Sequence, residues 1–347
     1  KFGMRWSAAR GFLKPARGRK NLLILTGALS DKVVFTDKRA TGLQFYLHGE
    51  LCQAQSRIET ILSAGSIGSP AILQRSGIGD AAFLQEKGIP VLHHSPGVGN
   101  NLQDHLQLRS IYKVQGIQTL NQTVKTWQGK VKMGLEYAFM RKGPLTMAPS
   151  QLGLFARSDD CVATPDLEYH VQPLSLDKFG DPLHDFPAFT ASVCDLRPAS
   201  RGWIKIADAD PNSAPLIAPC YLTAETDRIK AAKAIQLTRK IASQAALQPY
   251  QPEEYLPGSD YQSAEELALA AGKIGTTIFH PVGTCKMGRA DDPTAVTDSC
   301  LQVRGVQGLR VVDASIMPTI TSGNTSSPTI MLATKAAEMI LQDRLGA

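Results

Sequence analysis

One stretch, Gly65–Gly79 with the sequence GSIGSPAILQRSGIG, constrains the fold more than any other part of this 347-residue chain. It follows the segment Arg57–Leu62, which predicts a strand, and it contains an apolar run typical of a short helix. The early glycines allow the backbone to turn tightly beside a ligand, and Ser76–Gly79 is expected to stop the helix. Pro70 is expected near the first helical turn. The pattern therefore predicts a strand, a glycine turn and a helix.

The remaining segments differ in their hydrophobic pattern. The apolar run Asn21–Thr26 predicts a buried strand, and Val33–Thr36 with Gly42–Leu47 predicts a hairpin. Alternating runs in the middle of the chain predict an antiparallel sheet. These runs are Leu167–Leu174, Phe189–Leu196 and Trp203–Ala207. Further on, we expect a helix over Glu225–Leu247 with Ala234, Leu237, Ile241 and Ala245 on one face, a strand over Leu309–Val312 and a closing helix over Pro328–Leu345.

Composition excludes several classes of protein. The net charge is +6, but the basic residues are scattered and no nucleic-acid reading motif accompanies them, so we expect no nucleic-acid partner. The six cysteines form no CxxC pair and no Cys/His cluster, so no metal is expected. No apolar run approaches the ~20 residues that cross a bilayer, and no signal peptide opens the chain. The prediction is a cytoplasmic protein, with peripheral contact at the inner membrane left open.

A second motif, Phe279–Gly288 with the sequence FHPVGTCKMG, places a histidine directly before a proline. Proline disfavours helix in the residue before it, so His280 is expected on an extended segment from which its ring projects. Histidine titrates near neutrality and is suited to act as a general base. Cys285 is a rival as a nucleophile, but a buried structural thiol is the favoured interpretation.

A third motif joins the end of the strand at Asp313 to the closing helix through the loop Thr321–Ser327. Ser327 is a candidate N-cap and Pro328 a candidate first helical residue. Because a helix N-terminus favours negative charge, this loop is expected to stabilise an anionic ligand group.

These motifs resemble those of the glucose-methanol-choline (GMC) flavoprotein alcohol oxidoreductases. Gly65–Gly79 is similar to the second signature of that family, and the likeness extends to three further segments. These are Arg5–Arg10, Leu25–Ala28 and Gly97–His105. The resemblance implies an α/β, two-domain fold, in which a partial FAD-binding domain (1–105 and 273–347) accompanies an antiparallel-sheet substrate domain with helices (106–272).

The resemblance also implies roles for particular residues. His280 is expected to take the alcohol proton, and Asn324 occupies the position of a second catalytic residue, where an amide orients the substrate oxygen. The positions that the resemblance assigns to FAD are Ser30, Ala64, Gly65, Asp313, Ala314, Asn324, Thr325 and Ser326. The family's Gly-x-Gly-x-x-Gly turn and first signature are absent from the sequence, and residue 1 is Lys, so we expect a piece of a longer chain. FAD is expected for the intact protein, and its binding by this piece alone is in doubt.

The implied reaction is oxidation of a small primary alcohol to an aldehyde, with hydride passing to flavin N5. The string Asp313–Pro318 resembles bacterial choline and aliphatic-alcohol dehydrogenases, which favours a quinone or other acceptor over oxygen. Choline dehydrogenase is one alternative. A hydroxynitrile-lyase-like protein and a non-catalytic truncated member are the others. The oligomeric state stays open.

Overall fold

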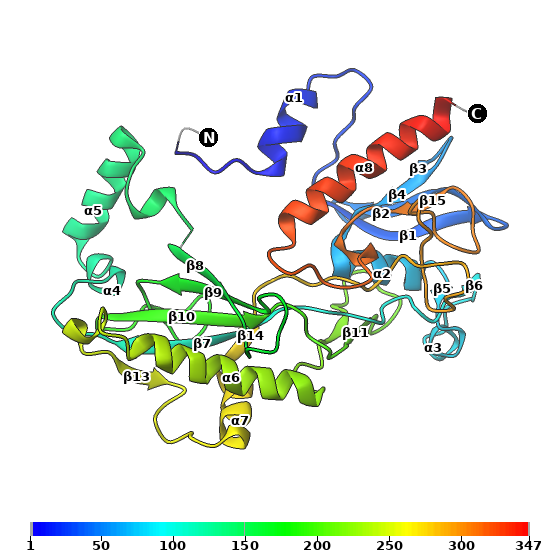
Figure 1. Ribbon diagram of the computed structural model, residues 1–347. Coiled ribbons are helices and arrows are strands. Elements are labelled where there is room, and N and C mark those ends of the chain that lie inside the picture. The colour runs from blue at the N-terminus through cyan, green and yellow to red at the C-terminus, as the bar shows by residue number, and fades with distance from the viewer. Residues whose placement is uncertain (1–2, 149, 346–347) are drawn as a thin grey trace. The chain divides into compact units, whose positions relative to one another are not determined.

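The computed structural model describes residues 3–148 and 150–345 (Figure 1). The chain forms two compact units. The first, here the sheet unit, comprises residues 1–25, 106–195 and 228–276. The second, here the mixed unit, comprises residues 26–105, 196–227 and 277–347. The chain therefore leaves the mixed unit and returns to it twice.

The sheet unit is built around a six-stranded sheet with strand order β13-β7-β10-β9-β8, in which β14 also pairs with β7. The strands are β7 Leu106–Lys113, β8 Leu152–Ala156, β9 Leu167–Gln172, β10 Ala188–Asp195, β13 Glu253–Leu256 and β14 Gly275–Thr277. The helices are η1 Ala9–Leu13, α1 Lys14–Ala16, α4 Leu120–Thr123, α5 Trp127–Leu135, η2 Glu136–Met140, η3 Pro144–Thr146, α6 Glu225–Ala242, η4 Gln248–Tyr250 and α7 Ala264–Ile274. The β7–β10, β10–β9, β9–β8 and β13–β7 pairs are all antiparallel, as the alternating runs predict.

Helix α6 packs on one face of this sheet. The hydroxyl of Tyr169 on β9 donates to the carbonyl of Ala234 at 3.2 Å and lies 3.1 Å from the hydroxyl of Thr238. Burial of Ala234 fits the predicted helix face, but α6 ends at Ala242, so Ala245 lies outside it and is exposed. The helix ends there because of a local contact. The Ser243 hydroxyl donates to the Lys240 carbonyl and so competes with the helical backbone hydrogen bonds.

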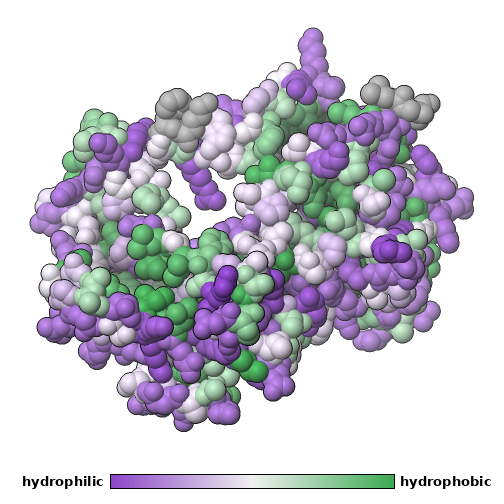
Figure 2. Space-filling model, viewed as in Figure 1, coloured by the Kyte–Doolittle hydropathy of each residue, from purple (hydrophilic) through white to green (hydrophobic). Residues whose placement is uncertain are grey.

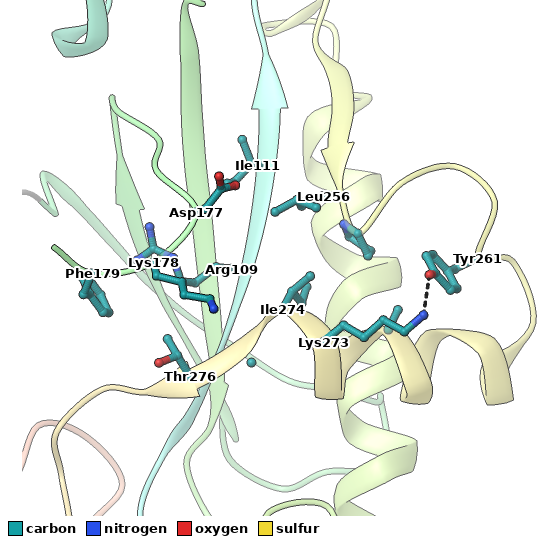
Figure 3. Close-up of a pocket in the computed structure, with 13 residues that line it drawn as sticks. Arg109, Ile111, Asp177, Lys178, Phe179, Leu256, Tyr261, Lys273, Ile274 and Thr276 are labelled. Carbon is teal, nitrogen blue, oxygen red and sulfur yellow. Dashed lines mark hydrogen bonds between the residues drawn. The ribbon is translucent and has the colours of Figure 1, made fainter. Parts of the chain in front are cut away.

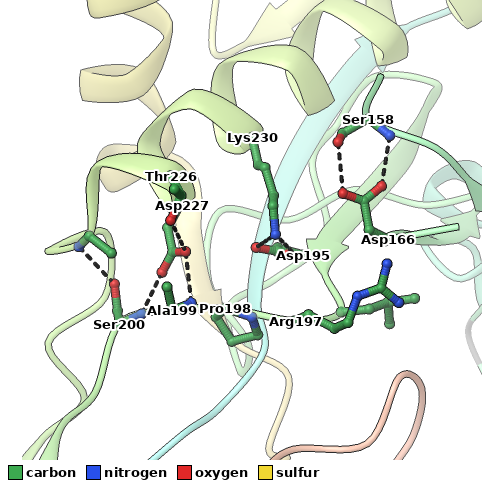
Figure 4. A network of polar contacts seen from close by, with 12 residues as sticks. Ser158, Asp166, Asp195, Arg197, Pro198, Ala199, Ser200, Thr226, Asp227 and Lys230 are labelled. Atoms are coloured by element: carbon green, nitrogen blue, oxygen red, sulfur yellow. Dashed lines mark hydrogen bonds and ion pairs between the residues drawn. The ribbon is translucent and has the colours of Figure 1, made fainter. Parts of the chain in front are cut away.

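Aspartate carboxylates near strand ends and turns bind neighbouring groups (Figure 4). In the sheet unit, Lys230 of α6 pairs with Asp195 at the end of β10 at 3.0 Å, and Asp166 accepts from Ser158. In the mixed unit, Asp227 accepts the backbone N–H groups of Ala199 and Ser200, each at 2.8 Å. Asp166 and Asp227 thereby fix backbone groups, and Asp195 joins β10 to α6.

The mixed unit contains small sheets and two principal helices. Its strands are β1 Ala28–Thr36, β2 Arg39–Leu47, β3 Glu50–Gln55, β4 Thr60–Leu62, β5 Ile78–Gly79, β6 His93–His94, β11 Trp203–Lys205, β12 Leu216–Ala218 and β15 Leu309–Val311. Its helices are α2 Gly65–Arg75, α3 Ala81–Glu86, η5 Ala314–Ile316 and α8 Ser326–Leu345. The predicted hairpin is confirmed as β1–β2, with Asp37 at positive φ in its turn.

The core of the mixed unit joins α2, β4, β15 and α8. Leu73 of α2 is fully buried beside Leu62 of β4 and Val311 of β15, and Ala336 of α8 belongs to the same cluster. Strands β4 and β15 run parallel, with Leu309 opposite Thr60. This packing places the start of α2 and the segment after β15 side by side, which positions the candidate site.

The segment Asn21–Thr26 departs from the prediction of a buried strand. It forms no strand, and Leu23 is 82% exposed. Apolar character alone does not make a strand, because the backbone groups also need a neighbouring strand to pair with. In residues 3–148 and 150–345 no strand pairs with this segment.

The divisions of the chain also differ from the predicted domain boundaries. Residues 196–227, expected in the substrate domain, belong to the mixed unit, because the Gln74 side chain of α2 hydrogen-bonds to the backbone of Ile204 and Ile206. Residues 1–25, expected in the FAD-binding domain, belong to the sheet unit, and the last crossing falls after Thr276 rather than after residue 272.

Helix α2 also corrects two local predictions. Gly68 lies inside the helix rather than in the turn, and a Cβ there would meet the Cβ of Ala64 at 2.8 Å. Pro70 is an interior residue rather than a first-turn residue. Its missing N–H would have bonded to the Ser66 carbonyl, which instead accepts from the Thr284 hydroxyl at 2.7 Å. The predicted stop is confirmed, since α2 ends at Arg75 and Gly77 follows at positive φ.

Apolar side chains are interspersed with hydrophilic ones on the visible surface (Figure 2). None of the described helices is both long enough and apolar enough to span a bilayer.

Candidate active site

His280 lies in the mixed unit on a segment that is neither helix nor strand, as the following proline predicts. Its backbone N–H donates to the Asp104 carboxylate at 2.9 Å. The same carboxylate accepts from the hydroxyls of Thr277 and Tyr221. Phe279, just before His280, has φ +64°, a conformation that is uncommon for a residue with a side chain. Asp104 therefore fixes a backbone turn that projects the His280 ring.

The side chain of His280 lies between two partners. Its Nδ1 is 3.1 Å from Nδ1 of His105, and its Nε2 is 3.3 Å from the Asn324 amide nitrogen. Nε2 of His105 lies 3.2 Å from the Leu196 carbonyl. His105 is fully buried and His280 is 8% exposed.

With both rings neutral, one pair of tautomers satisfies these contacts. The Leu196 carbonyl only accepts, so Nε2 of His105 carries its proton and Nδ1 of that neutral ring is an acceptor. His280 must then donate from Nδ1, which leaves the lone pair of a neutral His280 on Nε2. The amide nitrogen of Asn324 donates toward that lone pair. The arrangement orients Nε2 of His280 as a proton acceptor, which a general base requires.

Asp313, predicted to contact a cofactor, clamps the glycine turn to the end of β15. Its carboxylate accepts from the Gly65 backbone N–H at 2.9 Å, the Ser69 hydroxyl at 2.5 Å and the Ser315 backbone N–H at 2.8 Å. Both oxygens are thereby engaged within the protein. Its carboxylate therefore shapes the site, and any cofactor contact at this position falls to neighbouring atoms.

The helix α8 begins beside His280. Asn324, which contacts the His280 ring, is two residues before the first residue of α8, Ser326. The predicted cap is wrong: Ser327 lies inside the helix and Pro328 is its third residue. The first N–H groups of a helix have no partner within it and carry partial positive charge, so this helix start favours an anionic group near His280.

The remaining predicted cofactor positions fall into two groups. Ala64, Gly65 and Ala314 lie near the start of α2 with Asp313, and Thr325 and Ser326 lie at the start of α8. Ser30 is elsewhere: its carbonyl accepts from Arg75, the last residue of α2, whereas Gly65 is the first. An 11-residue helix is about 16 Å long, so Ser30 and Gly65 mark opposite ends of α2.

The site residues fit an anionic, planar cofactor such as a flavin. Gly65 has φ +77°, and a Cβ at that position would meet nothing within 4 Å, so the turn presents open space rather than a side chain. The α8 helix start supplies donors for a developing negative charge. Both features lie on segments linked to His280, since the Ser66 hydroxyl donates to the Pro281 carbonyl at 2.6 Å.

Sequence reasoning assigned no role to four residues of this network, which are Asp104, His105, Tyr221 and Thr277. Asp104 and His105 end the motif Gly97–His105, which was the one available signal. Burial, and next the Asp104 carboxylate, raise the pKa of the Tyr221 phenol, which therefore stays a donor.

Cys285 is fully buried, and burial raises the pKa of its thiol well above the ordinary value. Both properties suppress the thiolate that a nucleophile requires, which supports the structural interpretation. We expect iodoacetamide at pH 8 to label the exposed Cys161 and Cys300 and to leave Cys285 unmodified until the protein unfolds. Peptide mass mapping measures this, and rapid labelling of Cys285 in the folded protein would contradict it.

Comparison with known proteins identifies the family. Two GMC oxidoreductase models match the chain, one over residues 1–107 and one over residues 198–333. The chain belongs to the GMC oxidoreductase family. Both segments of the candidate site, around Gly65 and around His280, lie inside these matches. The family resemblance and the α/β two-domain class are confirmed.

Named relatives of this GMC oxidoreductase include choline dehydrogenases. It is 40% identical over 338 residues to oxygen-dependent choline dehydrogenase 1 of Chromohalobacter salexigens, covering 97% of this chain and 60% of that protein. It is 41% identical over 338 residues to the human mitochondrial choline dehydrogenase, covering 97% of this chain and 57% of that protein. The chain thus spans 60% or less of these relatives.

A solved structure shows the same fold. The crystal structure of pyridoxine 4-oxidase from Mesorbium loti superimposes with a TM-score of 0.84 at 28% identity. The match covers 97% of this chain and 62% of that one.

Proposed function

We propose that the protein containing this chain oxidises a primary alcohol to an aldehyde with FAD, and that Nε2 of His280 accepts the hydroxyl proton. The observation that carries the proposal is the hydrogen-bond chain from the Leu196 carbonyl through His105, which leaves the lone pair of His280 on Nε2. When bound, FAD would accept the hydride from the carbinol carbon.

The chain's own residues then have separable tasks. Asn324 donates toward the position that the alcohol oxygen must approach, so it orients the substrate but does not accept its proton. After proton transfer, His280 keeps its Nδ1–H bond to His105, so the ring does not have to rotate. Gly65, Ala64, Ala314, Thr325, Ser326 and, at the other end of α2, Ser30 are the residues proposed to hold the cofactor, together with the backbone of Asp313.

Choline is the second candidate substrate, because two relatives at 40% and 41% identity are named choline dehydrogenases. A quaternary ammonium is usually held by an aromatic cage. In the sheet unit, the aromatic pair Phe186 and Tyr255 already receives the ammonium of Lys113, at 5.1 and 5.0 Å from the ring centroids. That cluster is filled by the protein's own cation, so it does not favour choline over an uncharged alcohol.

The electron acceptor is proposed to be a quinone or another non-oxygen acceptor. Several relatives are named oxygen-dependent choline dehydrogenases, which makes oxygen the alternative acceptor to test.

The proposal is tested with FAD-loaded protein and three alcohols: choline, benzyl alcohol and hexan-1-ol. We expect aldehyde formation matched by reduction of a quinone analogue, and slower hydrogen peroxide formation when oxygen is the sole acceptor. Cleavage of a cyanohydrin without acceptor reduction would contradict the proposal and support a lyase. Faster turnover with oxygen than with the quinone would overturn the acceptor assignment alone.

A further inference from the structure

A buried arginine in the sheet unit, Arg109 on β7, has no hydrogen-bond partner among the described residues. It is 3% exposed, and none of its three guanidinium nitrogens forms a hydrogen bond with the described part of the chain. Burying an unpaired charge is costly, and buried arginines are normally paired with carboxylates or phosphates. Burial also lowers the pKa of Arg109, although an arginine remains charged. An arginine in this state lacks an anion.

Arg109 lines a cavity of about 400 Å³ that lies wholly within the sheet unit. Figure 3 shows β7, with Arg109 and Ile111, on one side of the cavity and the segment carrying Leu256, Tyr261 and Lys273 on the other. This volume is within the range of small-molecule sites. The cavity is therefore large enough for an organic molecule and not only for an ion.

The charges around the cavity favour an anion. Lys178 and Lys273 line it with Arg109, against one carboxylate, Asp177. Asp177 is 3.1 Å from the His184 ring, so its charge is partly engaged. Lys273 is anchored by a 2.9 Å hydrogen bond to the Tyr261 hydroxyl. Three cations facing one carboxylate leave an excess of positive charge.

The guanidinium of Arg109 is preorganised. Its central carbon lies 4.5 Å from the ring centroid of Phe179, so one face of the plane is stacked. The register places Ser192 opposite Arg109 on the neighbouring strand, and the Ser192 hydroxyl is also buried without a partner. Cross-strand partners share a face of the sheet, so the Arg109 guanidinium and the Ser192 hydroxyl are two donors on one face, and neither has a hydrogen-bond acceptor among the described residues.

The charge at one wall of the cavity favours a carboxylate monoanion over a phosphate dianion. The last turn of α7 lines the cavity with Ala270, Lys273 and Ile274, and the C-terminus of a helix carries partial negative charge. That end disfavours a phosphate dianion. Ile111 and Leu256 add apolar wall, which suits the hydrocarbon part of an organic acid.

We propose that this cavity binds a small organic carboxylate, with Arg109 holding the carboxylate through its planar fork and the apolar wall holding the hydrocarbon part. The proposal is independent of the alcohol oxidation at His280, and its test needs no FAD.

The test is calorimetric titration of the folded chain with hexanoate, its neutral counterpart hexanamide, and inorganic phosphate. We expect hexanoate to bind at least about tenfold more tightly than hexanamide, because charge-assisted fork contacts are the strong ones. We expect the same preference over phosphate, because phosphate has no hydrocarbon part to contact the apolar wall. The variant Arg109→Met should weaken hexanoate binding by about tenfold or more, and Arg109→Lys by less, because the ammonium lacks the fork. The control Lys113→Met removes a charge from the same strand outside the cavity and should leave binding unchanged.

Two results would overturn anion binding by Arg109, and a third would overturn the carboxylate class. One is equal binding of hexanoate and hexanamide by the parent protein, a comparison that does not depend on any variant folding. The other is unchanged hexanoate affinity in Arg109→Met. Tighter binding of phosphate than of hexanoate would overturn the carboxylate class. Unfolding of Arg109→Met in urea should occur at no lower concentration than for the parent, since the variant removes an unpaired buried charge.

Discussion

Replacing His280 by Asn is expected to slow flavin reduction by an alcohol about 10²–10⁴-fold, the usual contribution of a positioned general base. An asparagine amide still reaches the His105 Nδ1 position as a donor, so the buried contact that fixes the segment is retained. The substitution removes the Nε2 lone pair, which the hydrogen-bond chain makes the proton acceptor. Stopped-flow mixing of FAD-loaded protein with alcohol, without oxygen, measures the effect.

The matched control is His48→Asn. His48 is an exposed histidine of the same unit at φ +54°, a conformation that asparagine tolerates. Its flavin reduction should equal that of the parent. If His280→Asn holds FAD and its flavin is reduced at a rate within about threefold of the parent rate, His280 is not the base. Loss of a general base would lower that rate by about 10²-fold or more.

Replacing Asp313 by Asn is expected to lower the free energy of unfolding by about 3 kcal/mol, as is usual when a buried charged acceptor is removed. The carboxylate is 6% exposed and accepts three hydrogen bonds, from Gly65, Ser69 and Ser315. An amide offers one oxygen and directs its NH₂ group toward the remaining donors. Urea unfolding followed by circular dichroism measures the change.

A surface aspartate provides the comparison for this change. Asp291 is 73% exposed at its side chain and pairs with the exposed Arg289 at 3.2 Å. Exposed pairs contribute little, so Asp291→Asn should shift the unfolding free energy by less than about 1 kcal/mol. Equal unfolding curves for the two variants would show that Asp313 does not clamp the glycine turn.

Local patterns were enough to predict much of the fold. The β1–β2 hairpin and strands β9 and β10 follow from turn residues and alternation, which act within a few positions. The exposed run Asn21–Thr26 and the interior Pro70 were mispredicted for a different reason. Each depends on a distant partner: a missing strand neighbour in the first case, and the Thr284 hydroxyl in the second.

In the candidate site too, local motifs could be predicted and contacts with distant residues could not. His280 and Asn324 were predicted because their motifs resemble a family, and the structure places the Asn324 amide nitrogen 3.3 Å from Nε2 of His280. The contact between His105 and His280 joins residues 175 positions apart, so no local sequence pattern predicts it. Arg109 was not predicted as a binding residue. The sequence shows only an arginine in a strand, whereas the structure shows that it is buried and has no hydrogen-bond partner in the described part of the chain.

The most direct measurement is anaerobic mixing of the FAD-loaded protein with benzyl alcohol carrying either hydrogen or deuterium on its carbinol carbon. We predict that the oxidised flavin absorbance is lost with both alcohols and that flavin reduction is slower with the deuterated one. In His280→Asn, flavin reduction should be much slower with both alcohols, and deuterium should slow it by the same factor as in the parent. An oxidised flavin that persists with every primary alcohol tested, choline included, would contradict alcohol oxidation at this site.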